Sequence, residues 1–181
     1  MIQAMIETSA APLLTSTLLS SIHVIALITS GIMAGLFFVF SNFAMTVLAA
    51  LPHPAGMQAM QGVNEKILNK VFLSVFFLAA LLPLPLAGLV LLSSTAANTT
   101  TQTLFLLAGC VLYFVGVFLV TLLKNVPMNN RLARFDTNYA DYNQQAAQTY
   151  WQFYLVRWTQ WNHIRTASAI AATVCYSLGF F

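Results

Sequence analysis

Charged side chains are scarce in this 181-residue chain: Asp, Glu, Lys and Arg together make up 6% of it, against roughly 25% in soluble domains. Hydrophobic residues reach 59%, so a soluble fold could not cover its surface with polar groups. Disorder is excluded for the opposite reason, because so much apolar surface does not stay solvated. These proportions predict an integral membrane protein with a single domain, residues 1–181.

Cysteine and basic residues are also few. Two cysteines do not define a disulfide scaffold or a zinc site, and whether Cys110 pairs with Cys175 stays open. The seven Lys and Arg residues form no dense basic face, so we expect no nucleic-acid partner. The partners that we expect are the lipid bilayer and an apolar small molecule.

Four apolar stretches are each suited to cross a bilayer core, which takes about 20 helical residues. They predict an all-α, four-helix transmembrane bundle with helical extensions on the cytoplasmic side, and the spans cover approximately 18–44, 71–92, 103–123 and 164–181. Pro83 and Pro85 predict a kink in the second span. Glycine pairs predict close helix packing in the first and third spans: Gly31 with Gly35, and Gly109 with Gly116.

Lys and Arg are confined to the first and third connections and to the start of the fourth span, while the second connection, 93–102, carries no charge. Positive connections face the cytoplasm, so both termini are predicted outside it, in what we expect to be a bacterial inner membrane. The segment before the first span has no Lys or Arg, unlike a secretory signal, and we expect it to be retained.

Most of the distinctive polar residues fall at the cytoplasmic ends of these spans. Such residues need internal partners and often mark function; they are Ser41, Gln61, Asn64, Asn125, Asn129, Asn162, His163 and Arg165. A purely structural role stays open for each of these residues, because amides cap helix ends and Arg side chains reach toward lipid headgroups. Trp158 and Trp161 lie among these residues. They are interpreted either as part of an interfacial aromatic belt or as the wall of a site for a flat ligand.

Two groups of motifs resemble a known family. Gly31-Ile-Met-Ala-Gly-Leu-Phe-Phe-Val-Phe-Ser41, with Met60-Gln61 and Asn64, is similar to the opening half of the anthrone oxygenase-like membrane proteins. Asn125-Val-Pro-Met-Asn129, with Trp158 and Asn162-His-Ile-Arg165, resembles their closing half. The Asn-Val-Pro-x-Asn element is the most specific part. The sequence looks closer to the bacterial members, most of which carry only a domain of unknown function.

The resemblance implies a four-helix membrane bundle. It also implies the activity of the fungal members, which oxidise an anthrone to an anthraquinone with dioxygen. We therefore expect a membrane oxygenase or oxidoreductase, a monooxygenase acting on a flat, apolar, phenolic or quinone-like substrate. Dioxygen is the co-substrate in this interpretation, and any other cofactor is unknown. The family supplies no established catalytic residue.

The polar inventory suits an oxidation without a cofactor. An anthrone loses a benzylic proton to give an anion that itself reacts with dioxygen, so the protein must supply a base, oxyanion donors and a dry pocket. His163 is the expected base, with Asn125, Asn129, Asn162 and Arg165 as the other expected catalytic residues. The expected substrate-binding residues are Trp158, Trp161, Gln61, Asn64 and Ser41.

A metal is not expected. The topology places His23 near the outer face and His53 and His163 near the inner face, so three histidines cannot converge. A site made of His53 or His163 with Glu65 is the alternative.

Arg165 carries the most specific geometric prediction. We predict that it faces the bundle interior, bonds to the end of the third helix near Asn125 and Asn129, and takes Glu65 as its anionic partner. The rival function is non-enzymatic: a small membrane protein that binds a lipid or a partner membrane complex through Gly31, Gly35 and other small residues. Homo-oligomerisation is open in either case.

Overall fold

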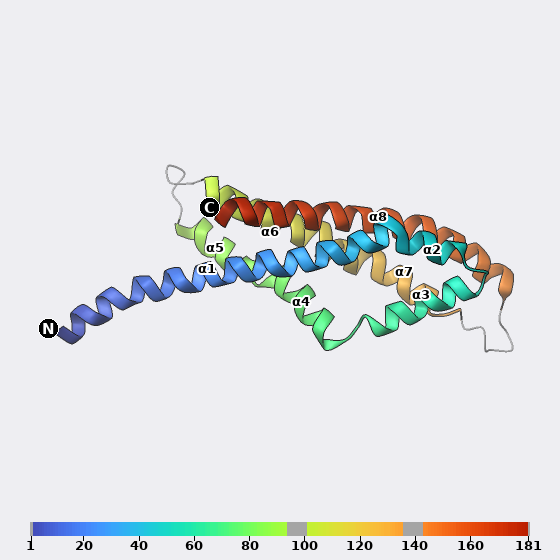
Figure 1. Cartoon of the computed structure of the whole chain (residues 1–181), viewed down its shortest axis with the longest axis horizontal. Coiled ribbons are helices and arrows are strands. Elements are labelled where there is room, and N and C mark those ends of the chain that lie inside the picture. The colour runs from blue at the N-terminus through green and yellow to red at the C-terminus, as the bar shows by residue number, and fades with distance from the viewer. Residues whose placement is uncertain (1, 94–100, 136–142, 181) are drawn as a thin grey trace.

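The computed structural model describes residues 2–93, 101–135 and 143–180, and every regular element in these ranges is a helix (Figure 1). Three helical stretches are long and apolar enough to cross a membrane, namely Ser20–Ala50, Lys70–Gly88 and Thr101–Leu132. The described chain is therefore all-α with the helices of a membrane protein, and these three stretches coincide with the first three predicted spans.

The fourth predicted span, 164–181, corresponds to the second half of α8, Gln144–Phe180. This half is less apolar than the other spans because it contains Arg165, Thr166 and Thr173. It packs along α1 (Ile2–Val39) and α6 (Thr101–Tyr113). The two threonine hydroxyls donate to carbonyls one turn earlier in α8, so they need no water.

The second span is kinked, as its prolines predict. Helix α4 (Lys70–Leu81) begins at a cap in which the Asn69 side chain accepts from the Phe72 amide at 3.0 Å. The axis then changes, and α5 (Pro83–Ser93) begins at a proline, which cannot donate to the preceding turn. The Pro83 carbonyl lies 3.7 Å from the Sγ of Cys110. Cys110 and Cys175 are both free thiols, so the disulfide left open by the sequence does not form.

The first span continues without a break from α1 through the π-helical segment η1 (Phe40–Ala44) into α2 (Met45–Ala50). In Figure 1 the first turns of α1 extend past the other helices, at the end of the molecule where α8 also finishes. The opposite end holds α2, α3 (Ala55–Lys66), α7 (Val126–Leu132) and the start of α8.

This opposite end has an apolar core of its own. Its buried residues come from α2, α3, α7 and the first half of α8, and include Met57, Met60, Leu132, Trp151 and Tyr154. The predicted helical extensions are therefore present, and they hold α3 across the ends of the longer helices. This placement of α3 creates the cavity described below.

Glycines allow α6 and α8 to pack closely. A Cβ on Gly109 would lie 2.7 Å from the Tyr176 ring, and a Cβ on Gly116, in the π-helical segment η2 (Phe114–Leu119), would clash with the Ser168 side chain. Gly31 faces Thr173 at an ordinary 3.7 Å. Gly35 would meet nothing within 4 Å, so the predicted pairing of Gly31 with Gly35 against one neighbouring helix does not form in the chain.

Candidate functional site

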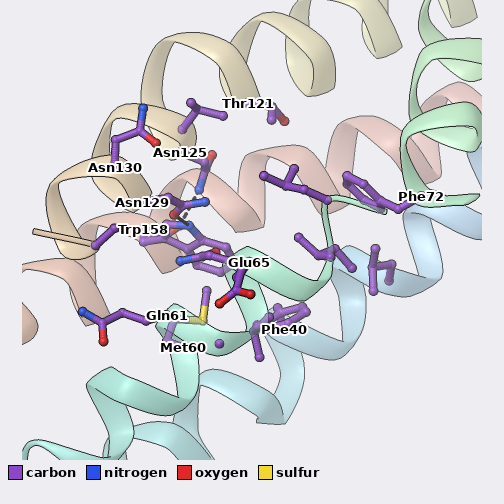
Figure 2. Close-up of a pocket in the computed structure, with 18 of the residues that line it drawn as sticks. Phe40, Met60, Gln61, Glu65, Phe72, Thr121, Asn125, Asn129, Asn130 and Trp158 are labelled. Carbon is purple, nitrogen blue, oxygen red and sulfur yellow. Dashed lines mark hydrogen bonds between the residues drawn. The ribbon is translucent and has the colours of Figure 1, made fainter. Parts of the chain in front are cut away.

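A cavity of about 660 Å³ lies where α3 crosses the ends of the longer helices. Its apolar lining residues include Leu36, Phe37, Phe40, Met60, Val63, Phe72 and Trp158, and the aromatic members of this set are called the aromatic wall below. Its polar lining residues include Gln61, Asn64, Glu65, Thr121, Asn125, Asn129, Asn130 and Arg165. Figure 2 shows the amides of Asn125 and Asn129 beside Trp158. Mixed cavities of this size are typical of small-molecule sites.

Two π-helical segments border this cavity. Phe40 begins η1, and Thr121 and Asn125 are the two ends of η3 (Thr121–Asn125). A π-helical turn inserts one residue into the helix, which redirects the side chains that follow, and such turns are frequent at functional sites. Phe40 and Asn125, from the two segments, line the same cavity.

Arg165 is the buried cation of the site, with 5% of its surface exposed. Its guanidinium donates to Asn162 Oδ1 at 2.8 Å and to Thr121 Oγ1 at 3.4 Å. It also lies over the rings of Phe37 (4.4 Å) and Trp158 (5.0 Å). The prediction that Arg165 faces inward and bonds to the third span is confirmed, with Thr121 rather than Asn125 or Asn129 as the acceptor.

Glu65 does not pair with Arg165, so this part of the prediction is wrong. Its Oε1 lies 2.9 Å from Lys66 Nζ, and both side chains are exposed. The hydrogen bond and the charge of Lys66 hold the pKa of Glu65 below its usual value. Glu65 still lines the cavity, and Figure 2 shows its carboxylate between Phe40 and Trp158. No carboxylate in the described part of the chain forms an ion pair with Arg165.

Asn162 holds Arg165 in place. It is fully buried, and its amide nitrogen donates to the Phe37 carbonyl and to Ser41 Oγ, both at 2.8 Å. These two bonds turn its oxygen toward Arg165. Ser41 also bonds to Thr166 at 2.8 Å. Asn162 and Ser41 therefore lie behind the cavity wall and position the guanidinium, rather than lining the cavity.

Asn129 organises the aromatic wall. Its Oδ1 accepts from Tyr154 Oη at 2.7 Å and from Trp158 Nε1 at 2.9 Å. Burial raises the pKa of Tyr154 well above its usual value, so its hydroxyl stays protonated and donates. Tyr154 and Trp158 stack with ring centroids 5.9 Å apart, and Phe40 meets Trp158 edge to face at 5.6 Å. The indole plane is thus fixed from three directions.

Asn125 is almost completely buried, with 1% of its surface exposed, and it lines the cavity. Its amide nitrogen donates to the Trp158 carbonyl at 3.4 Å, a long bond. Its Oδ1 is buried and has no hydrogen-bond partner, and the same is true of Arg165 Nε. Buried polar atoms are nearly always paired, so this corner of the cavity has one unused acceptor and one unused donor.

Gln61 and Asn64 line the cavity but use their amide groups to hold α3. Gln61 donates to the Leu132 and Phe135 carbonyls at 2.8 and 2.9 Å, at the end of α7. Figure 2 shows its amide directed away from Asn125 and Asn129. Asn64 donates to Tyr154 Oη at 3.4 Å. Their expected role in substrate binding is thus accompanied by a structural one.

His163 and Trp161 are not brought to the cavity. Trp158, Asn162 and Arg165 share the inward face of α8 at helical spacing, and His163, about 100° further round, is exposed. His163 is therefore not placed to act as the expected base on a ligand in the cavity. Trp161 lies under Lys124 Nζ, 5.1 Å from its ring centroid, and lines no part of the cavity. The described residues also hold no cluster of three His, Cys, Asp or Glu side chains able to bind a metal.

Phe37, Thr121 and Tyr154 were not predicted as site residues. Only Tyr154 carried a usable signal, because it precedes Trp158 by one helical turn on the face that points inward. Thr121 bonds to its own Val117 carbonyl at 2.7 Å, as threonines in apolar helices commonly do. Phe37 is one of 14 phenylalanines and has no distinguishing neighbour in the sequence.

Several residues of the site also lie in the part of the chain that matches a known family. Residues 68–175, more than half of the chain, match the family model described as anthrone oxygenase. The chain belongs to the anthrone oxygenase family. No curated protein and no solved structure matches it. The match contains Asn125, Asn129, Trp158 and Arg165, which line the cavity, and Asn162, which supports Arg165. Helix α3 and the end of α1 come before the matched residues, and they complete the cavity of this family member.

Proposed function

We propose that this member of the anthrone oxygenase family is a membrane oxygenase that oxidises a flat, apolar, phenolic or anthrone-like substrate in the cavity under α3. The observation that carries the proposal is one cavity that joins an aromatic wall to a buried guanidinium with no carboxylate partner among the described residues. The rings suit the body of the substrate, and the guanidinium suits the negative charge that develops on its oxygen.

The substrate carbonyl oxygen faces Arg165 while the rings lie along Trp158 and Phe40. Loss of a proton from the benzylic carbon then leaves an enolate whose charge lies on that oxygen. The desolvated guanidinium stabilises this anion more than water would, because the cavity has a lower effective dielectric constant. The guanidinium lies over the rings of Phe37 and Trp158, and these contacts limit its movement.

Glu65 is the proton acceptor in this proposal. Glu65 provides the carboxylate among the described residues that line the cavity. Its lowered pKa keeps this carboxylate ionised at neutral pH. The enolate transfers electrons to dioxygen, and a carbon–oxygen bond forms to give a peroxide, which takes the proton back from Glu65. Loss of water leaves the ketone, so substrate and dioxygen together yield quinone and water.

The test uses the purified chain in detergent or nanodiscs with anthrone and dissolved dioxygen. Dioxygen uptake and anthraquinone absorbance are followed together, and the spontaneous rate without protein is subtracted. Arg165→Gln should lower the catalysed rate by about 100-fold, the usual cost of one oxyanion donor. The matched variant Trp161→Leu changes an aromatic residue outside the cavity and should keep the rate. A wild-type rate no greater than the spontaneous one would reject the proposal.

For the membrane arrangement, we propose a four-helix transmembrane bundle in which α8 is the fourth span and both termini lie outside the cytoplasm of a bacterial cell. The exposed basic residues support this orientation, because Lys66, Lys70, Lys124, Arg131 and Arg134 gather at the cavity end. Single cysteines at Thr101 and at Arg134, in a background without Cys110 and Cys175, test it in sealed cells. A membrane-impermeant maleimide should label only the cysteine at position 101.

A further inference from the structure

The strongest unexplained feature of the molecule is the charge of Arg165. A buried cation is normally paired, because leaving water costs it several kcal/mol. The described part of the chain offers Arg165 no carboxylate within ion-pair distance, only two neutral oxygens and two rings. The titratable groups within electrostatic reach are the phenols of Tyr113 on α6 and Tyr154 on α8. Glu65 on α3 and Lys124 on η3 have other partners.

The surroundings of Arg165 are built so that it cannot turn away. Asn162 directs its oxygen at the guanidinium because its nitrogen is held by Phe37 and Ser41. The guanidinium also lies over the Phe37 and Trp158 rings. Its Nε–H remains without an acceptor. The protein therefore maintains one positive charge at the cavity edge and leaves part of its donor capacity unused.

Asn125 adds a second and independent observation. Its side-chain oxygen is buried and accepts no hydrogen bond. Its side-chain nitrogen donates to the carbonyl of Trp158, whose ring also contacts the Arg165 guanidinium. A ligand that satisfies both groups must accept from the guanidinium and donate to the amide oxygen. A carbonyl or ether ligand does the first only.

We propose that the cavity is a selective site for aromatic oxyanions, preferably those that keep a hydroxyl group on the same ring system. The oxyanion binds Arg165, the hydroxyl donates to Asn125, and the rings lie against Trp158 and Phe40. The ring system follows from the proposed function, and the selection of the ionised form goes beyond it. Acidic hydroxyquinones, which resemble the oxidised product, should therefore occupy the site and inhibit the reaction.

Quinones without a benzylic C–H bond test binding separately from turnover. The first probe pair is lawsone, a hydroxynaphthoquinone that is an anion at neutral pH, and its methyl ether, which has the same rings and cannot ionise. Quenching of tryptophan fluorescence reports binding under anaerobic conditions. Wild type should bind lawsone at least about 10-fold more tightly than the ether, since tenfold corresponds to one pKa unit of preference for the charged form.

Arg165→Gln should remove this preference while leaving the affinity for the ether within about twofold. Arg157→Gln is the matched control, because Arg157 is exposed on the same helix; it should keep the preference. The second probe, alizarin, keeps one hydroxyl as a monoanion at mildly alkaline pH. Asn125→Leu should weaken alizarin several-fold and leave lawsone unchanged.

Equal wild-type affinities for lawsone and its ether would overturn the proposal, and this measurement needs no variant to fold. A preference that survives in Arg165→Gln would overturn it as well. Displacement of lawsone by inorganic phosphate or by vesicles of phosphatidylglycerol, at equal concentration, would point to a phosphate site and reject the aromatic one. If the lawsone preference holds but anthrone is not oxidised, the anion site stands and the proposed oxygenase function fails.

Discussion

Asn162 accepts a hydrogen bond from the guanidinium of Arg165 at 2.8 Å, within one turn of α8. The same amide donates to the carbonyl of Phe37 on the neighbouring helix α1. One neutral side chain thus connects the backbone of α1 to the buried cation of α8, and it sets the direction in which that cation points.

Replacing Asn162 by Leu should therefore destabilise the protein as well as the site. The change removes two donors and the Arg165 acceptor from a buried position, and the free energy of unfolding should fall by about 1–3 kcal/mol. Thermal unfolding in detergent measures this. Gln160→Leu, at an exposed position of α8, is the control and should shift the midpoint little; equal shifts for the two variants would argue against the network.

Gly116→Ala should destabilise the contact between η2 and α8 by about 1–3 kcal/mol, because a Cβ there clashes with Ser168. Ser168→Gly should restore stability in the double variant, since the clashing atoms belong to the Ser168 side chain. Gly35→Ala is the matched control and meets nothing within 4 Å. It should be neutral or stabilising by up to about 1 kcal/mol, as expected for Gly to Ala in a helix. Failure of the double variant to recover would show that the clash is not the cause.

Gln61→Glu should loosen α3. A carboxylate cannot donate to the Leu132 and Phe135 carbonyls, so both hydrogen bonds are lost and the like partial charges repel. Hydrogen exchange of the amides in 55–66 should become faster, while exchange in α6 should not change. Gln152→Glu introduces the same charge at an exposed position of α8 and should leave α3 protected. Unchanged exchange in Gln61→Glu would mean that other contacts hold α3.

The pH dependence of oxidation should report the pKa of Glu65. Lys66 lowers that pKa from the ordinary value of 4.5, so the carboxylate is ionised throughout the neutral range. The rate should fall only when the pH drops below the ordinary value and protonates the base. In Lys66→Met this fall should begin at higher pH, because the pKa of Glu65 rises again. Lys70→Met changes the exposed lysine that begins α4 and should leave the profile unchanged. A fall that does not move in Lys66→Met would rule out Glu65 as the base.

Part of the candidate site was visible in the sequence because chain direction alternates between successive spans. Gln61, Asn64, Asn125, Asn129 and Arg165 fall at or beside the same end of the predicted spans, and the structure brings all of them to one cavity. Depth in a membrane follows directly from distance along a helix, at 1.5 Å per residue. This is why the level of the site could be predicted without knowing how the helices pack.

The direction of each side chain around its helix could not be predicted in the same way. Asn162 and His163 are neighbours in the sequence, yet one is fully buried and the other is exposed. A rotation of the helix by 100° exchanges their surroundings, and only packing against α1 and α6 selects the rotation. For this reason the sequence wrongly predicted His163 as a base that faces the site. The π-helical turns add a further rotation, and no residue in η1 or η3 predicts it.

The sequence by itself determined the class of the protein, the three candidate membrane spans, the kink at Pro83 and the gathering of polar residues at one end. These features follow from local apolar content, proline geometry and the length of each span. Only the tertiary structure decided which polar groups meet. It paired Glu65 with Lys66, gave Arg165 neutral partners, laid α3 over the helix ends and left the oxygen of Asn125 unpaired. These outcomes depend on contacts between residues that are up to 125 positions apart, and the rotation of each helix is set by how all of them pack together.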